Sequence, residues 1–377
     1  MEPEKQSFPA DAHASAHSPA ASQDGHDTAF GDDGGEPHNA TASRDERASA
    51  SSRSRVQPTS LAVTSETGDW PPHVLLIVSC VVVAAAGLGG NAARVALEKC
   101  LEGSSFFPKY HYIGPNILGS FLMGFFVTVL PSESELPLAY SALCVGFCGS
   151  LTTFSSWIVK VMTQNTVADA FEHLLLGGTM PLVLFLWGRD CGRGVQWCFE
   201  RVFGCPLEVC PLHRSLLRGV ELVMCVLLVL ASILTPILVQ VYINEGGIRG
   251  ISTDDVRVVA LAPAGAVIRF LLSVYMNNKA CAAKFPLGTL AANLLGVLLA
   301  IIMQNMEVNH PSCTWHVTVQ NGICGALSTV SSLANEVVLF YGSGRILLGY
   351  AYALVSIGFS VLIAGVGRPQ LYHRRVS

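Results

Sequence analysis

Nine long apolar segments between residues 74 and 366 limit what this chain can fold into. A helix needs about 20 apolar residues to cross the hydrocarbon core of a bilayer, and these segments are close to that length. Hydrophobic residues make up 51% of the chain and charged residues only 13%, whereas soluble domains carry about a quarter charged residues. The sequence therefore predicts an all-α polytopic membrane protein. The predicted spans are Val74–Ala96, Ile113–Leu130, Leu138–Val161, Phe171–Trp187, Val220–Ile243, Val258–Met276, Leu287–Met303, Val317–Tyr341 and Ile346–Val366.

Residues 1–70 differ from the rest, because they are rich in Ser, Ala, Asp, Gly and His and almost free of large aliphatic side chains. Such a segment buries too little apolar surface to offset the entropy of ordering the chain, so we expect a disordered tail. It has no apolar stretch of the kind found in a signal peptide. The formal charge of −4 and the absence of a strong basic cluster argue against a nucleic-acid partner.

The second half of the apolar region repeats the first half. Three short motifs recur in the same order, at separations of 175, 177 and 176 residues. Such regularity indicates that one four-helix unit occurs twice. The motif pairs are GGNAAR ending at Arg94 with GAVIR ending at Arg269, NILG from Asn116 with NLLG from Asn293, and CGSLTTFSS from Cys148 with CGALSTVSS from Cys324.

A single predicted span, Val220–Ile243, separates the two groups of four. Because four is even, a second group joined directly to the first would have the same orientation in the membrane. The single extra span reverses the second group, which predicts a 4+1+4 arrangement of inverted repeats. An excess of Lys and Arg on the side of the N-terminus favours a cytosolic N-terminus. The expected segments are the tail 1–70, the first unit 71–188, an Arg- and Cys-rich connector 189–219, the inverting helix 220–243, a loop 244–256, the second unit 257–366 and a C-terminal tail 367–377.

Polar residues recur at equivalent places inside the spans. An ionisable residue in a span is costly, so Arg94 and Arg269 are candidates for function or for a structural ion pair, with snorkelling to an interface as the alternative. Asn116 and Asn293 each offer two N–H donors without a charge, which suits an anion pore. Their alternative role is an interhelical hydrogen bond beside a small packing residue.

The stretch from Gly149 to Thr153 contains Gly, Ser and Thr, which weaken a helix. An unwound turn exposes backbone carbonyls, and two such turns from inverted helices suit a dehydrated cation. A small-residue packing face in an intact helix is the alternative. Phe154 and Trp157 share a helix face, and their electropositive ring edges suit the wall of an anion path, although core or lipid-facing aromatics are the ordinary alternative.

The last span carries a stripe of hydroxyl groups, because Tyr352, Ser356 and Ser360 recur at every fourth residue. The stripe suits a water or anion track, or else interhelical hydrogen bonding. At an offset of 176 residues, the first unit has no hydroxyl at any of the three positions. The residues there are Leu176, Met180 and Leu184.

Other chemistry is not favoured by the sequence. Cys191, Cys198, Cys205 and Cys210 precede His213 in the connector, but their spacing matches no common zinc pattern, so free thiols, lipidation or disulfides are favoured over a metal site. We see no paired nucleophile and base at one membrane depth, so we do not expect an enzyme. The P-loop sequence is absent, which argues against ATP coupling.

Taken together, these motifs resemble the fluoride channel family, which comprises the bacterial Fluc (CrcB) channels and the eukaryotic FEX exporters. The resemblance rests on G-x-x-x-R in the first span, N-x-x-G in the second and GFCGSLTTFSSW in the third, which is close to the family signature G-G-L-T-T-F-S-T-F. It covers roughly residues 87–188 and 261–365. It implies a passive fluoride-selective channel that works as a single chain in the lipid bilayer of the plasma membrane and exports fluoride.

The resemblance also implies roles for particular residues, and it implies no catalytic cofactor. The backbone carbonyls of Gly149, Thr152, Gly325 and Ser328 match positions that hold a structural sodium ion at the repeat interface. The fluoride pore is expected to involve Asn116, Asn293, Phe154, Trp157, Thr153, Thr329, Ser331, Tyr352, Ser356 and Ser360. The charged membrane residues of the family type are Arg94, Arg269 and Glu336.

The chain departs from the family pattern in ways that differ between the units. Val330 and Leu333 stand where the second unit should carry aromatic residues, and Lys160 stands where the first unit should carry an acid. The aromatics survive in one unit and the hydroxyl stripe in the other. We therefore hypothesise one working pore built jointly by both units. A secondary transporter of another small ion or solute is the alternative, although few buried acids or histidines support proton coupling.

Overall fold

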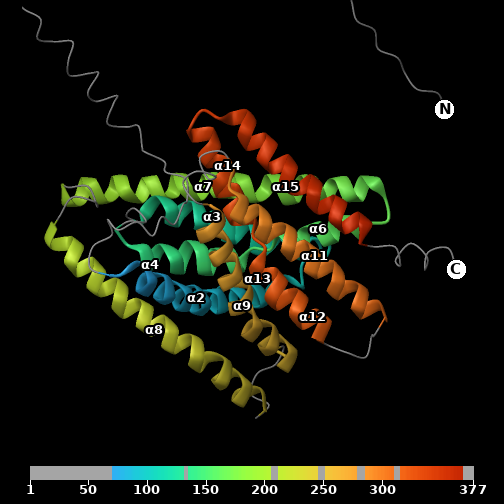
Figure 1. The fold of residues 1–377 in the computed structure, drawn as a ribbon, viewed down its shortest axis with the longest axis horizontal. Coiled ribbons are helices and arrows are strands. Elements are labelled where there is room, and N and C mark those ends of the chain that lie inside the picture. Colours follow the sequence, from blue (N-terminus) through green and yellow to red (C-terminus); the bar gives the residue numbers. More distant parts are fainter. Residues whose placement is uncertain are drawn as a thin grey trace, which may run out of the picture. The chain divides into compact units, whose positions relative to one another are not determined.

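The computed structural model describes residues 70–130, 135–204, 211–244, 251–277, 285–309 and 315–367. Within these ranges every regular element is a helix (Figure 1), which confirms the predicted fold class. The tail predicted as disordered lies outside the described residues up to residue 69. The loop predicted at 244–256 and the C-terminal tail lie only partly within them.

The first unit has four helical segments, of which the third is broken into pieces. The α2 and α3 helices come first, and α3 packs closely along α7. Glycine makes this approach possible, since a Cβ atom on Gly124 would lie 2.0 Å from the carbonyl oxygen of Phe185. The bounds are α2 Pro72–Leu101, α3 Ile113–Val129, α4 Pro137–Tyr140, η1 Ser141–Cys148, α5 Gly149–Leu151, α6 Phe154–Met162 and α7 Val167–Phe203.

The second unit repeats this order of segments. Its first helix, α9, begins at a capping box in which Ser252 and Asp255 each accept a hydrogen bond from the backbone N–H of the other. Its third segment is broken at the position equivalent to the break in the first unit. The bounds are α9 Thr253–Met276, α11 Leu287–Asn309, α12 Trp315–Val319, η2 Gln320–Cys324, α13 Gly325–Leu327, α14 Val330–Gly342 and α15 Ile346–Val366.

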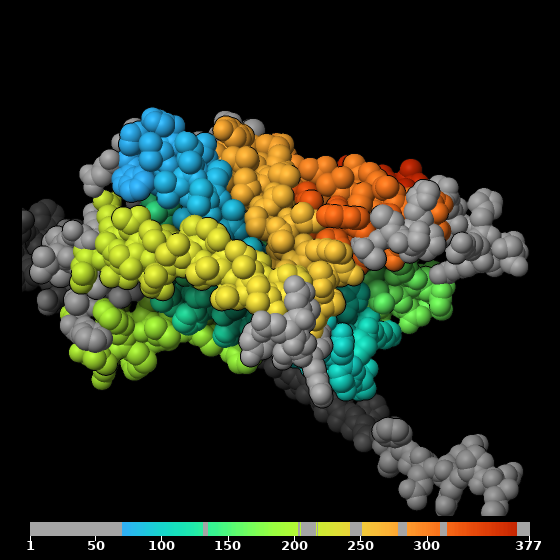
Figure 2. Space-filling model, turned by 90° about the horizontal axis from the view of Figure 1, so that it is seen from below, coloured from blue at the N-terminus to red at the C-terminus, as the bar shows by residue number. Residues whose placement is uncertain are grey.

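A single long helix, α8 (Pro211–Asn244), connects the two units. It packs against α2, α4 and α9, and in the space-filling view it lies across the surface (yellow in Figure 2). Only 6% of its most apolar window is buried inside the protein, as expected for a helix that faces lipid. Its one buried acid, Glu221, accepts a 2.6 Å hydrogen bond from the backbone N–H of Ala139 and so fixes α8 to the first unit.

Eight helical segments in the described ranges are long and apolar enough to cross a membrane, and α3 is a shorter apolar helix of 17 residues. The 4+1+4 arrangement of nine membrane crossings therefore stays a prediction. The predicted connector differs from the structure, because α7 continues through Gly188 to Phe203. Its 37 residues extend about 55 Å at 1.5 Å per residue, so the helix continues beyond the end of the predicted apolar span. Cys191 and Cys198 are free thiols there, and Cys205 and Cys210 lie outside the described residues.

Candidate ion pathway

Each unit contains a helix that is interrupted at its Ser- and Thr-rich stretch. The backbone is extended at Thr152 and Thr153, with ψ of 153° and 118°, and at Ser328 and Thr329, with ψ of 146° and 133°. The hydroxyls of Thr153 and Thr329 then cap the following helices by accepting a backbone N–H three residues on. The predicted break is confirmed, and the alternative of an intact helix is wrong.

The two breaks are bound to each other by reciprocal hydrogen bonds. The backbone N–H of Ser331 donates to the Thr152 hydroxyl at 3.3 Å, and that of Ser155 donates to the Ser328 hydroxyl at 2.9 Å. The same two pairs of hydroxyls are 3.1 and 2.9 Å apart. Thr152 is equivalent to Ser328 and Ser155 to Ser331, so the contacts repeat across a local two-fold relation. The Thr152 and Thr329 hydroxyls, 3.0 Å apart, also bond across it.

The two candidate pore asparagines form hydrogen bonds with the backbone at the breaks. Asn116 accepts the N–H of Thr153 at 2.8 Å and donates its side-chain N–H to the carbonyl of the same residue at 3.1 Å. Asn293 makes the same pair of bonds with Thr329, at 2.7 and 3.1 Å. Both side chains are fully buried. An amide nitrogen carries two hydrogens, so each asparagine keeps a second donor beyond the one used on the backbone.

These bonds leave four backbone carbonyls without their helical donors. In an α-helix, each carbonyl accepts from the N–H four residues later. In the first unit, the N–H of Thr153 goes to Asn116, and that of Ser156 goes to the Thr153 hydroxyl. The second unit diverts the equivalent two donors in the same way. Carbonyl oxygens are suitable ligands for a hard cation, so the residues fit a sodium ion. The carbonyls are those of Gly149, Thr152, Gly325 and Ser328.

The two membrane arginines reach across from one unit to the other. Arg269 donates across to the carbonyl of Val145 at 2.9 Å and within its own unit to that of Ala326 at 3.0 Å. Arg94 donates across to the carbonyl of Asn321. Val145 and Asn321 are equivalent positions in the π-helices η1 and η2, where the wider turn changes the backbone bonding. Both arginines are only 2–3% exposed, so snorkelling to an interface is wrong.

The hydroxyl stripe of α15 faces the interior and is joined to an acid. Tyr352, Ser356 and Ser360 are all fully buried. The Tyr352 hydroxyl and the Thr289 hydroxyl each donate to Glu336, both at 2.5 Å. Ser356 donates to the Tyr352 carbonyl at 2.8 Å, whereas the Ser360 hydroxyl has no partner among the described residues. Sequence reasoning missed Thr289, although it lies one turn before Asn293 on α11.

A cavity of about 40 Å³ adjoins this group of residues. Arg269, Thr289, Ser332 and Glu336 are among its lining residues from the second unit, and Met123 is among those from the first. Its walls therefore come from both units, with one cation and one acid among them. A space of this size holds a water-sized particle.

The aromatic pair of α6 is buried and its members point to different neighbours. Phe154 and Trp157 meet edge to face with their ring centroids 5.4 Å apart. Trp157 rests on α7 at Gly177, and its indole N–H donates to the His173 carbonyl at 2.8 Å. Both rings belong to the same buried apolar cluster as Tyr352 of the second unit. Trp157 differs from Phe154 in that it also has a donor, which is engaged within its own unit.

The fourth helix of the first unit presents a different face from the one expected. Its buried positions include Gly177, Pro181 and Phe185, whereas Met180 exposes 36% of its surface. A shift of one residue turns a helix by about 100°, so an offset of 176 residues does not hold on α7. The inward positions still carry no hydroxyl, and Phe185 fills the space with a ring that is 1% exposed. The expected counterparts were Leu176, Met180 and Leu184.

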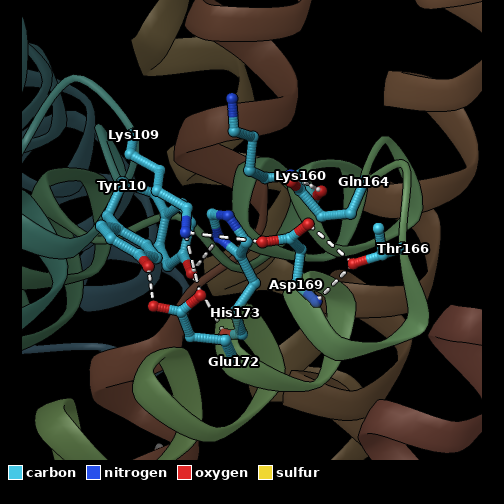
Figure 3. A network of polar contacts seen from close by, with 9 residues as sticks. Lys109, Tyr110, Lys160, Gln164, Thr166, Asp169, Glu172 and His173 are labelled. Carbon is cyan, nitrogen blue, oxygen red and sulfur yellow. Dashed lines mark hydrogen bonds and ion pairs between the residues drawn. The ribbon is translucent and has the colours of Figure 1, made fainter. Parts of the chain in front are cut away.

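A network of polar contacts at the start of α7 was not predicted (Figure 3). The ammonium of Lys109 lies 2.9 Å from Glu172 and 3.6 Å from Asp169, and the Tyr110 hydroxyl also donates to Glu172. Hydrogen bonding to Tyr110, followed by that to Glu172, raises the pKa of Lys109 above its usual value. These exposed charges tie the loop before α3 to α7, and exposed ion pairs contribute little stability.

The chain is thus an integral membrane protein built from a duplicated helical unit with two paired helix breaks. The family model described as CrcB-like protein, Camphor Resistance (CrcB), matches residues 81–188 and again residues 256–368. These two matches cover more than half of the chain, and the chain belongs to the CrcB family.

Several characterised proteins are similar to the chain. Fluoride export protein 1 of Candida albicans is 29% identical over 260 residues, which are 63% of this chain but only 62% of that relative. Fluoride export protein 1 of Schizosaccharomyces pombe is 28% identical over 294 residues, 73% of this chain and 90% of that relative. The fluoride-specific ion channel FluC of Serratia proteamaculans is 36% identical over 102 residues, 26% of this chain and 78% of that relative. No solved structure shows a significant match.

Proposed function

We propose that this protein is a fluoride-selective passive channel that exports fluoride from the cell and so provides fluoride resistance. The names of its relatives support the choice of ion. The observation that carries the proposal is the arrangement of three helices: α6 of the first unit packs against both α11 and α15 of the second. Phe154, Asn293 and the hydroxyl stripe each lie on one of these three packed helices. We call this region the shared pathway.

Fluoride holds its hydration shell strongly, so a pore for this ion must replace water with other donors. The shared pathway offers the spare N–H of Asn293, the unpartnered hydroxyl of Ser360 and the electropositive edge of Phe154. None of these groups carries a charge. Neutral donors stabilise the ion enough for entry without holding it too tightly to leave.

We propose that only the shared pathway conducts. The equivalent region between α14, α3 and α7 contains Asn116 and the buried hydroxyl of Ser120, but it has no hydroxyl at the buried positions of α7. Val330 replaces the aromatic residue there, and Phe185 packs with Met123, Ala334 and neighbouring apolar residues in a continuous cluster. A fully apolar section offers a dehydrated anion no compensating donors. Trp157, with its donor engaged by His173, positions α6 against α7 in this proposal.

A sodium ion at the paired breaks would be held by the freed carbonyls of Gly149, Thr152, Gly325 and Ser328. It would supply positive charge near the centre of the protein when bound. The chain's own residues fix those carbonyls, since Asn116 and Asn293 take the N–H groups that would otherwise engage Gly149 and Gly325. The two breaks are held together by hydrogen bonds that involve the side chains of Thr152, Ser155, Ser328 and Ser331.

The setting of the channel is also part of the proposal. A passive pore lets fluoride leave down its electrochemical gradient under an inside-negative potential, and we propose the plasma membrane as the location because the proposed task is export from the cell. The positive-inside tendency of the loops supports a cytosolic N-terminus. Both units lie in one chain and together complete the shared pathway, so a single chain is sufficient for transport.

Fluoride efflux from liposomes that contain the purified protein tests the proposal. A fluoride electrode follows efflux after an ionophore removes the opposing potential, and liposomes loaded with chloride serve as the control. We expect rapid fluoride efflux and chloride efflux at the rate of empty liposomes. Absence of fluoride efflux, or equal efflux of chloride, contradicts the proposed function.

A further inference from the structure

The last turns of α7 carry an apolar stripe that includes two cysteines. From Trp187 onward, apolar side chains recur at intervals of three or four residues, so they fall within about 80° of one another around the helix. The charged residues Arg189, Arg193 and Glu200 lie on other faces of the same stretch. The members of this stripe, which we call the α7 stripe, are Trp187, Cys191, Val195, Cys198 and Val202.

The α7 stripe is exposed, although the face beside it packs closely on α3. A Cβ atom on Gly192 would stand 2.8 Å from the Cβ atom of Thr128, and the side chain of Gln196 donates to the Thr128 carbonyl at 2.6 Å. The members of the stripe are exposed, except for Cys191, which is half-buried. A contiguous row of exposed apolar side chains marks an interaction surface.

The stripe reaches one edge of the predicted membrane-spanning region. The bond from Gln196 to Thr128 places this part of α7 level with the end of α3, where an apolar span also ends. Next to it, Trp197 is exposed and the guanidinium of Arg201 lies 5.6 Å from the centre of its ring. Tryptophan and arginine are typical of the boundary between membrane and water. Cys198 therefore lies at this boundary.

We propose that Cys198 and Cys191 are S-acylated, and that their long acyl chains cover the α7 stripe and enter the adjacent membrane. An acyl chain is the occupant that fits, because it is apolar along its length and both cysteines lie within the apolar row itself. Cys191 is about 10 Å from Cys198 along the helix axis, so two chains lie side by side on one face. Cysteines close to a membrane span are common sites of acylation.

The chemistry is a thioester exchange that needs no oxidant or reductant. The cysteine sulfur attacks the carbonyl carbon of a long-chain acyl thioester of coenzyme A. A thioester forms at the cysteine, the bond to the coenzyme A sulfur breaks, and the cysteine proton leaves with the coenzyme A thiol. The donor is cytosolic, and four predicted spans return the end of α7 to the side of the N-terminus, which we propose to be the cytosol. Transport of fluoride is not required for this inference.

Acyl exchange on the full-length protein from eukaryotic cells tests the inference. Free thiols are blocked, hydroxylamine cleaves thioesters, and a second reagent labels the thiols that are released. Trypsin cleavage after Arg193 and Arg201 gives a peptide whose one cysteine is Cys198, and the preceding peptide carries Cys191. We expect label on both peptides only after hydroxylamine, and more on the exposed Cys198. Cys100 is the control, because it is also exposed but ends α2 on the opposite side, and we expect no label there.

A displaced cysteine separates the stripe from simple closeness to the membrane. Cys198→Ser combined with Glu200→Cys moves the thiol about 200° around the helix and only about 3 Å along it. Position 200 is exposed, and the new thiol lies in the same tryptic peptide. We expect this peptide to lose its label, because an acyl chain attached there has no apolar row to lie on.

Three outcomes would overturn the inference. Absence of label from both Cys198 and Cys191 would show that the stripe carries no acyl chain. Undiminished label in the displaced variant would show that the stripe does not direct the modification. Label on Cys100 in place of Cys198 would put the end of α7 on the outer side, which contradicts the proposed orientation as well and leaves the proposed transport of fluoride untouched.

Discussion

The guanidinium of Arg269 lies directly against Gly149 of the other unit, in the space that a side chain at that position would occupy. A Cβ atom at residue 149 would stand 1.7 Å from Nη1 of Arg269. The second unit repeats the relation, since a Cβ atom on Gly325 would lie 2.4 Å from Nη1 of Arg94. Each break therefore needs glycine because the arginine of the opposite unit passes beside it.

Gly149→Ala should destabilise the protein strongly. The methyl group displaces a guanidinium that is bonded to the carbonyls of Val145 and Ala326, and hydrogen bonds to a charged group contribute about 1.5–3 kcal/mol each. We expect unfolding in detergent at a temperature lower by several degrees, with a loss of fluoride efflux. Gly89→Ala is the control, since its nearest atom would be 3.8 Å away. Equal stability of the two variants would contradict the close contact.

The two asparagines should behave alike in stability and differently in transport. Asn116→Ala and Asn293→Ala each leave a buried backbone N–H unpaired, at about 1–3 kcal/mol, so both should unfold more easily. Only Asn293 lies on a helix of the shared pathway. We expect fluoride efflux per folded protein to fall about ten-fold for Asn293→Ala, equivalent to about 1.4 kcal/mol in the barrier, and to change little for Asn116→Ala.

Gln196→Ala is the control for the asparagine variants, because Gln196 donates to the Thr128 carbonyl far from either break. Unchanged efflux in both asparagine variants would mean that neither residue serves a needed pore. A large loss of fluoride efflux in Asn116→Ala alone would place the conducting pathway in the region between α14, α3 and α7.

Phe185→Ala tests the region that we consider closed. Truncation of a buried Phe costs about 3–5 kcal/mol, so the variant should be less stable, while fluoride efflux per folded protein stays at the wild-type level. Phe171→Ala is the matched control, because Phe171 lies on the same helix and is 63% exposed. An increase of efflux in Phe185→Ala would show that this side chain blocks a second pathway that is otherwise competent.

The general architecture was predictable from the sequence because its signals are local. Apolar length fixes the spans, and the repeat of the motifs around Arg94 and Arg269 fixes two equivalent units. Gly149 and its neighbouring Ser and Thr residues predicted the break, since their helix weakness does not depend on distant contacts. The resemblance to a known family then supplied roles that the residues alone left open.

Other features depend on contacts between distant residues and could not be predicted in this way. The bonds of Arg269 to Val145 and of Thr152 to Ser331 cross between the units, and no local pattern specifies them. The register of α7 also changed by one residue relative to α15, because packing of Gly177 against Trp157 sets its rotation. The charged residues after Gly188 predicted a connector, but α7 continues through them to Phe203. Charged residues such as Arg and Glu retain helix propensity outside the apolar core.

Ser360→Ala tests the central claim, one shared pathway, most directly. The Ser360 hydroxyl is fully buried and has no partner among the described residues, so its removal should leave stability within about 0.5 kcal/mol of the wild type, as is usual where no interaction is lost. Ser120→Ala is the matched control, because its hydroxyl is equally buried and unpartnered but lies on α3. The measurement is fluoride efflux from liposomes that contain equal amounts of each folded variant. The account predicts slower efflux for Ser360→Ala and wild-type efflux for Ser120→Ala. Wild-type efflux for Ser360→Ala, or a loss confined to Ser120→Ala, would contradict it.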